Sequence, residues 1–149
     1  MPSITKLVAL LISPALAVNL QPVGVSDTLY KCTYDSSAKY LTITPSGLTD
    51  EIVCGAVDGE DKSFNAEQME EMPTVKLNGH DKDAYYTLIL ASPEDEIPIA
   101  PILHQIVTNI KGIDLANGKI SDGTEIVKYI RPNPPVIWKL FNYVYLVYK

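Results

Sequence analysis

The 149-residue sequence has few of the residues that build metal and redox sites, with only 2 cysteines and 2 histidines. Cys32 and Cys54 do not form a Cys-x-x-Cys motif, so zinc and thiol redox chemistry have no support. No H-E-x-x-H, G-x-S-x-G, P-loop or glycine-rich nucleotide motif occurs either. We therefore expect no cofactor and no enzyme. Chain order alone leaves a Ser/His/Asp triad open, because triads are recognised by geometry rather than by sequence position.

Clustered positive charge is also missing. The chain has 12 Lys and Arg against 18 Asp and Glu, for a formal net charge of -6, and its basic residues are spread singly. Binding to nucleic acid requires clustered cations, so we expect no nucleic-acid partner and no attraction to an anionic membrane surface. The acidic residues that gather between Asp58 and Glu71 are interpreted as a solvated face.

No hydrophobic run is long enough to cross a bilayer, which takes roughly 20 residues. The longest run, Leu7 to Val18, covers about 12 residues, and Pro14 interrupts it. Lys6 precedes the run, and the small residues of Ala15-Leu16-Ala17 end it. This pattern is typical of a secretory signal, so we expect residues 1–17 to be removed and a secreted domain to span residues 18–149. A buried first strand or helix is the alternative.

The two cysteines are expected to form a disulfide if the protein is secreted, since an even pair is usually oxidised outside the cell. A Cys32–Cys54 bridge would close a loop of about 23 residues and stabilise the fold by ~3 kcal/mol in the chain-entropy model. The alternative is two free, buried thiols.

Short alternating segments bounded by turn residues predict a mainly β protein. One helix is predicted over Asn65 to Met72, with Asn65 and Gln68 in a capping-box pattern and Pro73 after its end. Tyr143 to Tyr148 is apolar on both faces, which indicates a central strand. Many short strands and few helices favour a single antiparallel β-sandwich with one or two short helices. The expected strands are Leu29–Tyr34, Lys39–Thr44, Glu51–Ala56, Thr74–Leu77, Tyr85–Ala91, His104–Ile110, Glu125–Ile130 and Tyr143–Tyr148.

The second half of the chain carries an ordered set of motifs. His104 and Asn109 form a His-x-x-x-x-Asn pattern, followed by Tyr129-Ile130 and by the pair Pro134-Pro135. Together with the strand Tyr86-Thr87-Leu88-Ile89-Leu90 and the final strand Leu140 to Tyr148, this order resembles the phosphatidylethanolamine-binding protein family. The resemblance covers about half of the chain well. The sequence stops at Lys149, before the last strand and helix that are usual in the family, so we expect a short member.

The resemblance implies a β-sandwich with a small anion-accepting pocket. His104 takes the place of the pocket histidine. Ser92-Pro93-Glu94-Asp95-Glu96 stands in place of Asp-Pro-Asp-x-Pro, and Phe141 and Asn142 replace the histidine and arginine of Gly-x-His-Arg. We expect a phospholipid headgroup or another small anion in an altered, less cationic pocket. The alternative is a protein-interaction module, such as a serine carboxypeptidase or other protease inhibitor, with a vestigial pocket. The expected ligand-binding residues are Ser92, Pro93, Glu94, His104, Tyr129, Pro134, Pro135 and Phe141.

Overall fold

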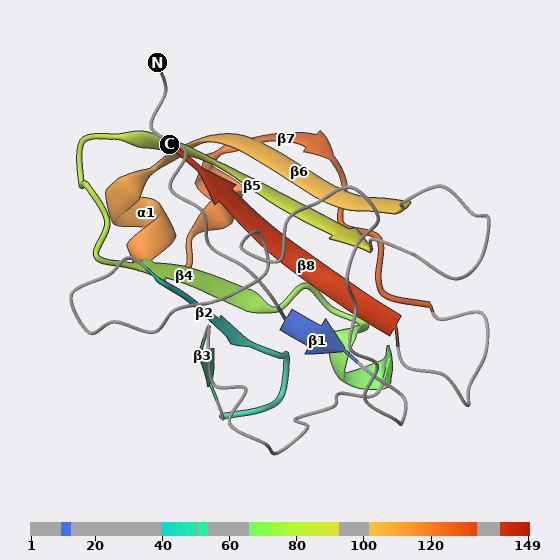
Figure 1. Cartoon of the computed structure of the whole chain (residues 1–149). Coiled ribbons are helices and arrows are strands. Elements are labelled where there is room, and N and C mark those ends of the chain that lie inside the picture. Colours follow the sequence, from blue (N-terminus) through green and yellow to red (C-terminus); the bar gives the residue numbers. More distant parts are fainter. Residues whose placement is uncertain (1–9, 13–39, 50, 54–65, 93–101, 134–140) are drawn as a thin grey trace, which may run out of the picture.

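Antiparallel strands in two sheets dominate the protein, as a computed structural model shows (Figure 1). It describes residues 10–12, 40–49, 51–53, 66–92, 102–133 and 141–149. The larger sheet has the strand order β1-β8-β5-β6-β7, and the smaller sheet has the order β3-β2-β4. The strands are β1 (Leu10–Ile12), β2 (Tyr40–Thr44), β3 (Ile52–Val53), β4 (Thr74–Asn78), β5 (Tyr85–Ser92), β6 (Ile102–Lys111), β7 (Thr124–Val127) and β8 (Phe141–Tyr148).

Period-two alternation explains why β5 forms and which side chains it buries. Tyr86, Leu88, Leu90 and Ser92 face the core, while the residues between them are more exposed, as expected for a strand with one covered face. β8 lies between β1 and β5, with residues 141–143 paired to β1 and residues 144–148 paired to β5. The predicted burial on both faces is not found in the described side chains, because Tyr145 and Val147 are buried while Tyr148 is exposed.

The two sheets share one hydrophobic core, which confirms the predicted mainly β sandwich. Its side chains come from the facing surfaces of both sheets and from the short helices between them. Burial of these large side chains is the main source of stability in a domain of this size. The core consists of Leu41, Ile43, Met69, Val75, Leu77, Tyr86, Leu88, Leu90, Val107, Ile110, Leu115, Ile120, Tyr143, Tyr145 and Val147.

The helices differ from the sequence prediction. In place of a helix over Asn65 to Met72, the structure has a single 3-10 turn, η2 (Ala66–Met69). The segment is too short to hold an α-helix by its own propensity, and burial of Met69 fixes it as a tighter turn instead. A short helix that the sequence did not predict, α1 (Gly112–Ala116), follows β6, and a second 3-10 turn, η3 (Ile120–Asp122), comes after it.

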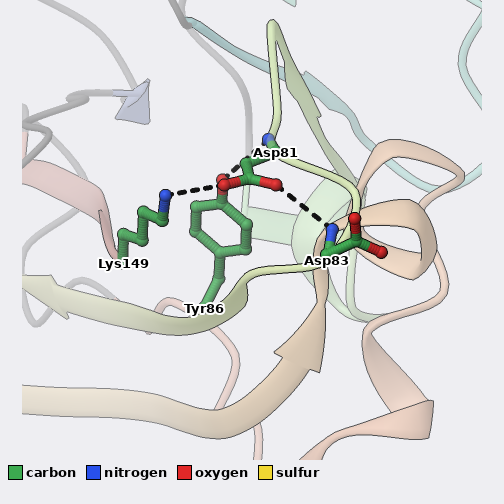
Figure 2. Close-up of polar contacts among 4 residues, drawn as sticks. All are labelled: Asp81, Asp83, Tyr86 and Lys149. Carbon is green, nitrogen blue, oxygen red and sulfur yellow. Dashed lines mark hydrogen bonds and ion pairs between the residues drawn. The ribbon is translucent and has the colours of Figure 1, made fainter.

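A tight turn centred on Asp81 joins β4 to β5 (Figure 2). The Asp81 carboxylate accepts hydrogen bonds from Lys149 Nζ at 2.7 Å and from the Asp83 N–H at 3.2 Å. Its own backbone N–H donates to the Tyr86 hydroxyl at 3.0 Å. Gly112 packs directly against this turn, because a Cβ placed there would lie only 1.9 Å from the Asp81 carbonyl oxygen. The turn therefore links the start of α1 to the end of β8.

Several sequence predictions fall wholly or partly outside the described residues. Cys32 and Cys54, and with them the predicted disulfide, lie there, as does the predicted strand Leu29–Tyr34. Leu10–Ile12, within the predicted signal segment, forms β1 and pairs with β8. This pairing does not test export of the chain, so secretion and the alternative of a buried first strand both stay predictions. In the part of the chain that is described, no helix has the length and apolar character needed to cross a membrane.

Candidate functional site

A β-bulge in β6 sets the position of the predicted pocket histidine. Leu90 pairs with Gln105, but the next residue of β5, Ala91, pairs with Leu103. His104 is therefore the extra residue of a β-bulge, at the register shift between Leu90 and Ala91. Regular alternation would place His104 and Gln105 on opposite faces of the sheet, whereas here both are buried, at 4% and 1% exposure.

A second irregularity in β6 explains the asparagine of the His-x-x-x-x-Asn pattern. Asn109 has φ of 57°, a left-handed conformation that asparagine adopts more readily than most residues. It lies where the register between β5 and β6 shifts again, between the Tyr86 and Leu88 pairs. Its side chain donates to Thr124 Oγ1 at 3.4 Å. Asn109 thus shapes the strand that carries His104.

The hydrogen bonds of His104 determine which ring nitrogen carries a proton. Nδ1 lies 2.8 Å from the Ile130 carbonyl oxygen, and a carbonyl can only accept, so Nδ1 is the donor. Nε2 lies 3.2 Å from Ser92 Oγ. In the neutral imidazole the Ser92 hydroxyl therefore donates to Nε2. In the protonated imidazolium Nε2–H donates instead, and the serine proton is released to face another acceptor.

Aromatic contact holds the imidazole in this orientation. The rings of His104 and Tyr143 meet edge to face, with centroids 5.1 Å apart and an interplanar angle of 69°. Such T-shaped pairs add about 0.5–1.5 kcal/mol beyond the burial of their area. Tyr143 is itself 3% exposed and comes from β8, so three neighbouring strands (β8, β5 and β6) supply the polar site.

Two further tyrosines lie near this site, Tyr145 fully buried and Tyr129 partly buried. The Tyr129 hydroxyl donates to the Met69 carbonyl oxygen at 2.6 Å. Burial raises the pKa of Tyr129 above its ordinary value, and the nearby Tyr143 raises it further. Burial also raises the pKa of Tyr145 well above its ordinary value, with a smaller contribution from Tyr129. Both phenols therefore stay neutral at physiological pH and act as hydrogen-bonding groups.

Unsatisfied polar atoms occur beside His104. The Gln105 side chain donates to Met72 Sδ at 3.0 Å, but its Oε1 has no hydrogen-bond partner within the described part of the chain. The Tyr145 hydroxyl, which is fully buried, also has none there. Both residues pair with Leu90 from opposite sides, so they share the core face of the sheet. Buried groups of this kind are rare unless water or a ligand satisfies them.

The structure brings together only some of the residues that the sequence predicted for the site. Ser92 and His104 are in hydrogen-bond contact, and Tyr129 precedes the carbonyl that orients the histidine ring. Phe141 begins β8, but its side chain is not described, and Pro93, Glu94, Pro134 and Pro135 lie outside the described residues. Sequence reasoning missed Gln105, Tyr143 and Tyr145 as members of this buried layer. The two tyrosines could have been found, because alternation places both on one face of the predicted strand.

Surface charge near the site is already paired. Arg131 follows Ile130 and donates to Glu70 Oε1 at 2.8 Å, with both side chains more than half exposed. An exposed pair of this kind contributes little to stability. The Arg131 guanidinium is thus directed to the Glu70 carboxylate, just after η2.

Comparison with curated proteins supports the resemblance found in the sequence. CEN-like protein 1 from Nicotiana tabacum is 38% identical over 81 residues, which cover 52% of this chain and 43% of that relative. Over the same length, Protein CENTRORADIALIS-like and Protein BROTHER of FT and TFL 1, both from Arabidopsis thaliana, are 33% and 35% identical. Over about half of its length, the chain is therefore similar to plant members of the phosphatidylethanolamine-binding protein family.

The relationship has a limited extent. The matched part of the chain corresponds to less than half the length of each of these relatives. No protein-family model matches the chain. The mainly β fold agrees with this partial similarity, and the two together support a binding protein of this general kind.

Proposed function

We propose that the protein binds a small anion, such as the phosphate of a lipid headgroup, through His104 and Ser92. The observation that carries the proposal is the contact between His104 Nε2 and Ser92 Oγ at 3.2 Å inside the sandwich. The kinship to phosphatidylethanolamine-binding proteins supports it, because the family resemblance implies an anion-accepting histidine at this position. Pro93, Glu94, Pro134, Pro135 and Phe141 stay proposed members of the same site.

Protonation is the physical switch in this site. The Ile130 carbonyl holds the proton on Nδ1, so Nε2 of the neutral ring only accepts and repels an anion. When the ring is protonated, Nε2–H donates to Ser92 Oγ, and the Ser92 hydroxyl is then free to donate to an anion. The freed hydroxyl and the positive charge of the buried ring together favour an oxyanion. Anion binding should therefore be accompanied by proton uptake.

Calorimetric titration with phosphorylethanolamine and with inorganic phosphate tests the proposal. We expect binding that is tighter at pH 6 than at pH 8, because only the protonated ring carries a positive charge and frees the Ser92 hydroxyl for an anion. His104→Ala should abolish binding, and Ser92→Ala should weaken it. The matched control is His80→Ala, which removes the chain's other histidine from the turn after β4. Equal loss of affinity in the His80 and His104 variants, or no heat with either ligand at millimolar concentration, would contradict the proposal.

A protein-interaction role is the second candidate, and exposed apolar side chains favour it. Ile126 and Ile130 are 61% and 52% exposed, and Ile102 and Leu103 at the start of β6 are also exposed. Apolar groups of this size that gather at one end of neighbouring strands are typical of contact surfaces. A carboxypeptidase inhibition assay beside a lipid-overlay assay separates the two roles. Inhibition that Ile126→Asp and Ile130→Asp abolish, without phosphate binding, would favour this second candidate.

Secretion belongs to the same proposal. The apolar stretch that begins at Leu7 and the small residues Ala15 and Ala17 near its end support cleavage after Ala17. Expression in a secreting host, followed by mass measurement of the exported chain, tests it. An exported chain that starts at Val18 and carries a Cys32–Cys54 bridge is the expected product.

A further inference from the structure

Ser92, His104 and the Ile130 carbonyl are arranged as a hydrogen-bonded relay. Ser92 Oγ lies 3.2 Å from Nε2 of His104, and Nδ1 on the other side of the ring lies 2.8 Å from the Ile130 oxygen. We propose that Ser92 is a nucleophile, activated by His104 as general base, that accepts an acyl or phosphoryl group from an activated ester. This is a covalent role for Ser92, in addition to the reversible binding proposed above.

The geometry meets the requirements for an activated serine. A nucleophile and its base must lie within about 2.6–3.2 Å, and a third group must hold the base in the correct tautomer. The carbonyl of Ile130 fulfils the third role, because it binds the proton on Nδ1 and leaves the Nε2 lone pair directed at Ser92. The backbone fixes this acceptor in turn, since the Ile130 N–H donates to the His104 carbonyl oxygen at 2.8 Å.

The surroundings keep the relay assembled. The edge-to-face contact with Tyr143 restricts rotation of the imidazole, and the bulge in β6 directs its ring toward Ser92 of the neighbouring strand. Ser92 and His104 are 1% and 4% exposed, so bulk water does not compete for their hydrogen bond. A carbonyl carries no full charge, so it stabilises an imidazolium less than a carboxylate does. The serine should therefore react more slowly than that of a protease.

The proposed step transfers one group and one proton. With diisopropyl fluorophosphate, Ser92 Oγ attacks phosphorus, the new O–P bond forms and the P–F bond breaks. The hydroxyl proton moves to Nε2 of His104, and fluoride leaves with the bonding electron pair. The product is a diisopropylphosphoryl ester on Ser92 and an imidazolium that later loses its proton to water. The proposal concerns this single transfer and not turnover.

Intact-mass and peptide-mapping spectrometry after exposure of the full chain to diisopropyl fluorophosphate tests the proposal. We expect one adduct per chain, located on Ser92, which forms faster at pH 8 than at pH 6 because the base must be unprotonated. Ser92→Ala should remove the adduct. The matched control is Ser121→Ala, which removes an exposed serine of η3 and should leave labelling unchanged.

The base is tested with His104→Gln, whose amide can still donate to the Ile130 carbonyl. Loss of general-base assistance should slow labelling by roughly 10²–10⁴-fold. If this variant melts at a lower temperature than the parent, the pH dependence of the labelling rate in the parent chain decides whether His104 acts as the base. Three results would overturn the inference. The reagent labels exposed serines only, or it forms no adduct at millimolar concentration. The third is a rate of Ser92 labelling that does not change between pH 6 and pH 8. Anion binding strengthens as pH falls whereas labelling strengthens as pH rises, so the two proposals fail separately.

Discussion

Replacing Gly112 by alanine should destabilise the protein through a collision with the Asp81 turn. The new Cβ would lie 1.9 Å from the Asp81 carbonyl oxygen, although real Cβ contacts are essentially never shorter than 3.0 Å. The backbone must therefore move by at least ~1.1 Å. A shift of this size breaks the 2.8 Å hydrogen bond from the Gly112 N–H to the Ala84 carbonyl oxygen. It also disturbs the start of α1.

Two opposing contributions set the magnitude. Alanine favours a helix over glycine by about 1 kcal/mol, and Gly112 is the first residue of α1. Overpacking costs about 1–3 kcal/mol, and a buried backbone group left without its partner costs a further ~1–3 kcal/mol. The steric contribution is larger, so we expect a net loss of ~2–4 kcal/mol in the free energy of unfolding. At about 2–4 °C per kcal/mol, the melting temperature should fall by roughly 4–16 °C.

Urea and thermal unfolding followed by circular dichroism measure this loss, with Gly47→Ala as the control. Gly47 has φ of 76°, but nothing lies within 4 Å of the position where its Cβ would be. Alanine there meets only backbone strain, which costs about 1–2 kcal/mol. A smaller loss for Gly112→Ala than for Gly47→Ala would refute the steric reasoning. So would an unchanged melting temperature for Gly112→Ala.

Three other variants probe the buried tyrosines and the surface pair. Tyr129→Phe removes the donor to the Met69 carbonyl and should cost about 1–2 kcal/mol in urea unfolding at pH 7. Tyr145→Phe removes a hydroxyl without a partner in the described residues, so its stability at pH 7 should equal or exceed that of the parent. Burial raises the pKa of Tyr145, so the native state keeps the phenol proton at pH values where the unfolded chain loses it. The free energy of unfolding is therefore retained below pH 10 and falls above it. Tyr145→Phe should reduce this alkaline loss in melting curves recorded from pH 8 to pH 11. Arg131→Ala breaks only the exposed pair with Glu70 and should change unfolding by less than ~0.5 kcal/mol; a larger change would mean that this pair is more strongly coupled to η2 than its exposure indicates.

The strands were more predictable from the sequence than the helices. Alternation located β5 and β6 closely, with predicted limits of Tyr85–Ala91 and His104–Ile110 against Tyr85–Ser92 and Ile102–Lys111 in the structure. Period-two burial leaves a direct trace in such sequences. The helix after β6 left none, because Gly112–Ala116 begins with a glycine and lasts little more than one turn.

The site was predictable in its central residue but not in its contacts. A family pattern pointed to His104, and the order of the motifs placed Ser92 near it. The contact of both His104 and Gln105 with the core depends on a bulge, which shifts the register of strand pairing and has no signature in a single sequence. The role of the Ile130 carbonyl was also invisible, since a backbone acceptor is not encoded by the residue type.

The pairing of β1 with β8 has a consequence for the cleavage proposed after Ala17. Leu10, Leu11 and Ile12 pair with Tyr143, Asn142 and Phe141. A chain cut after Ala17 loses β1, and the backbone groups at the start of β8 then become available to a strand from elsewhere. Tyr143, which contacts the His104 ring, lies in that stretch. If the cleavage proposed above takes place, the full chain and the cut chain differ beside the His104 ring, and ligand measurements on one do not describe the other.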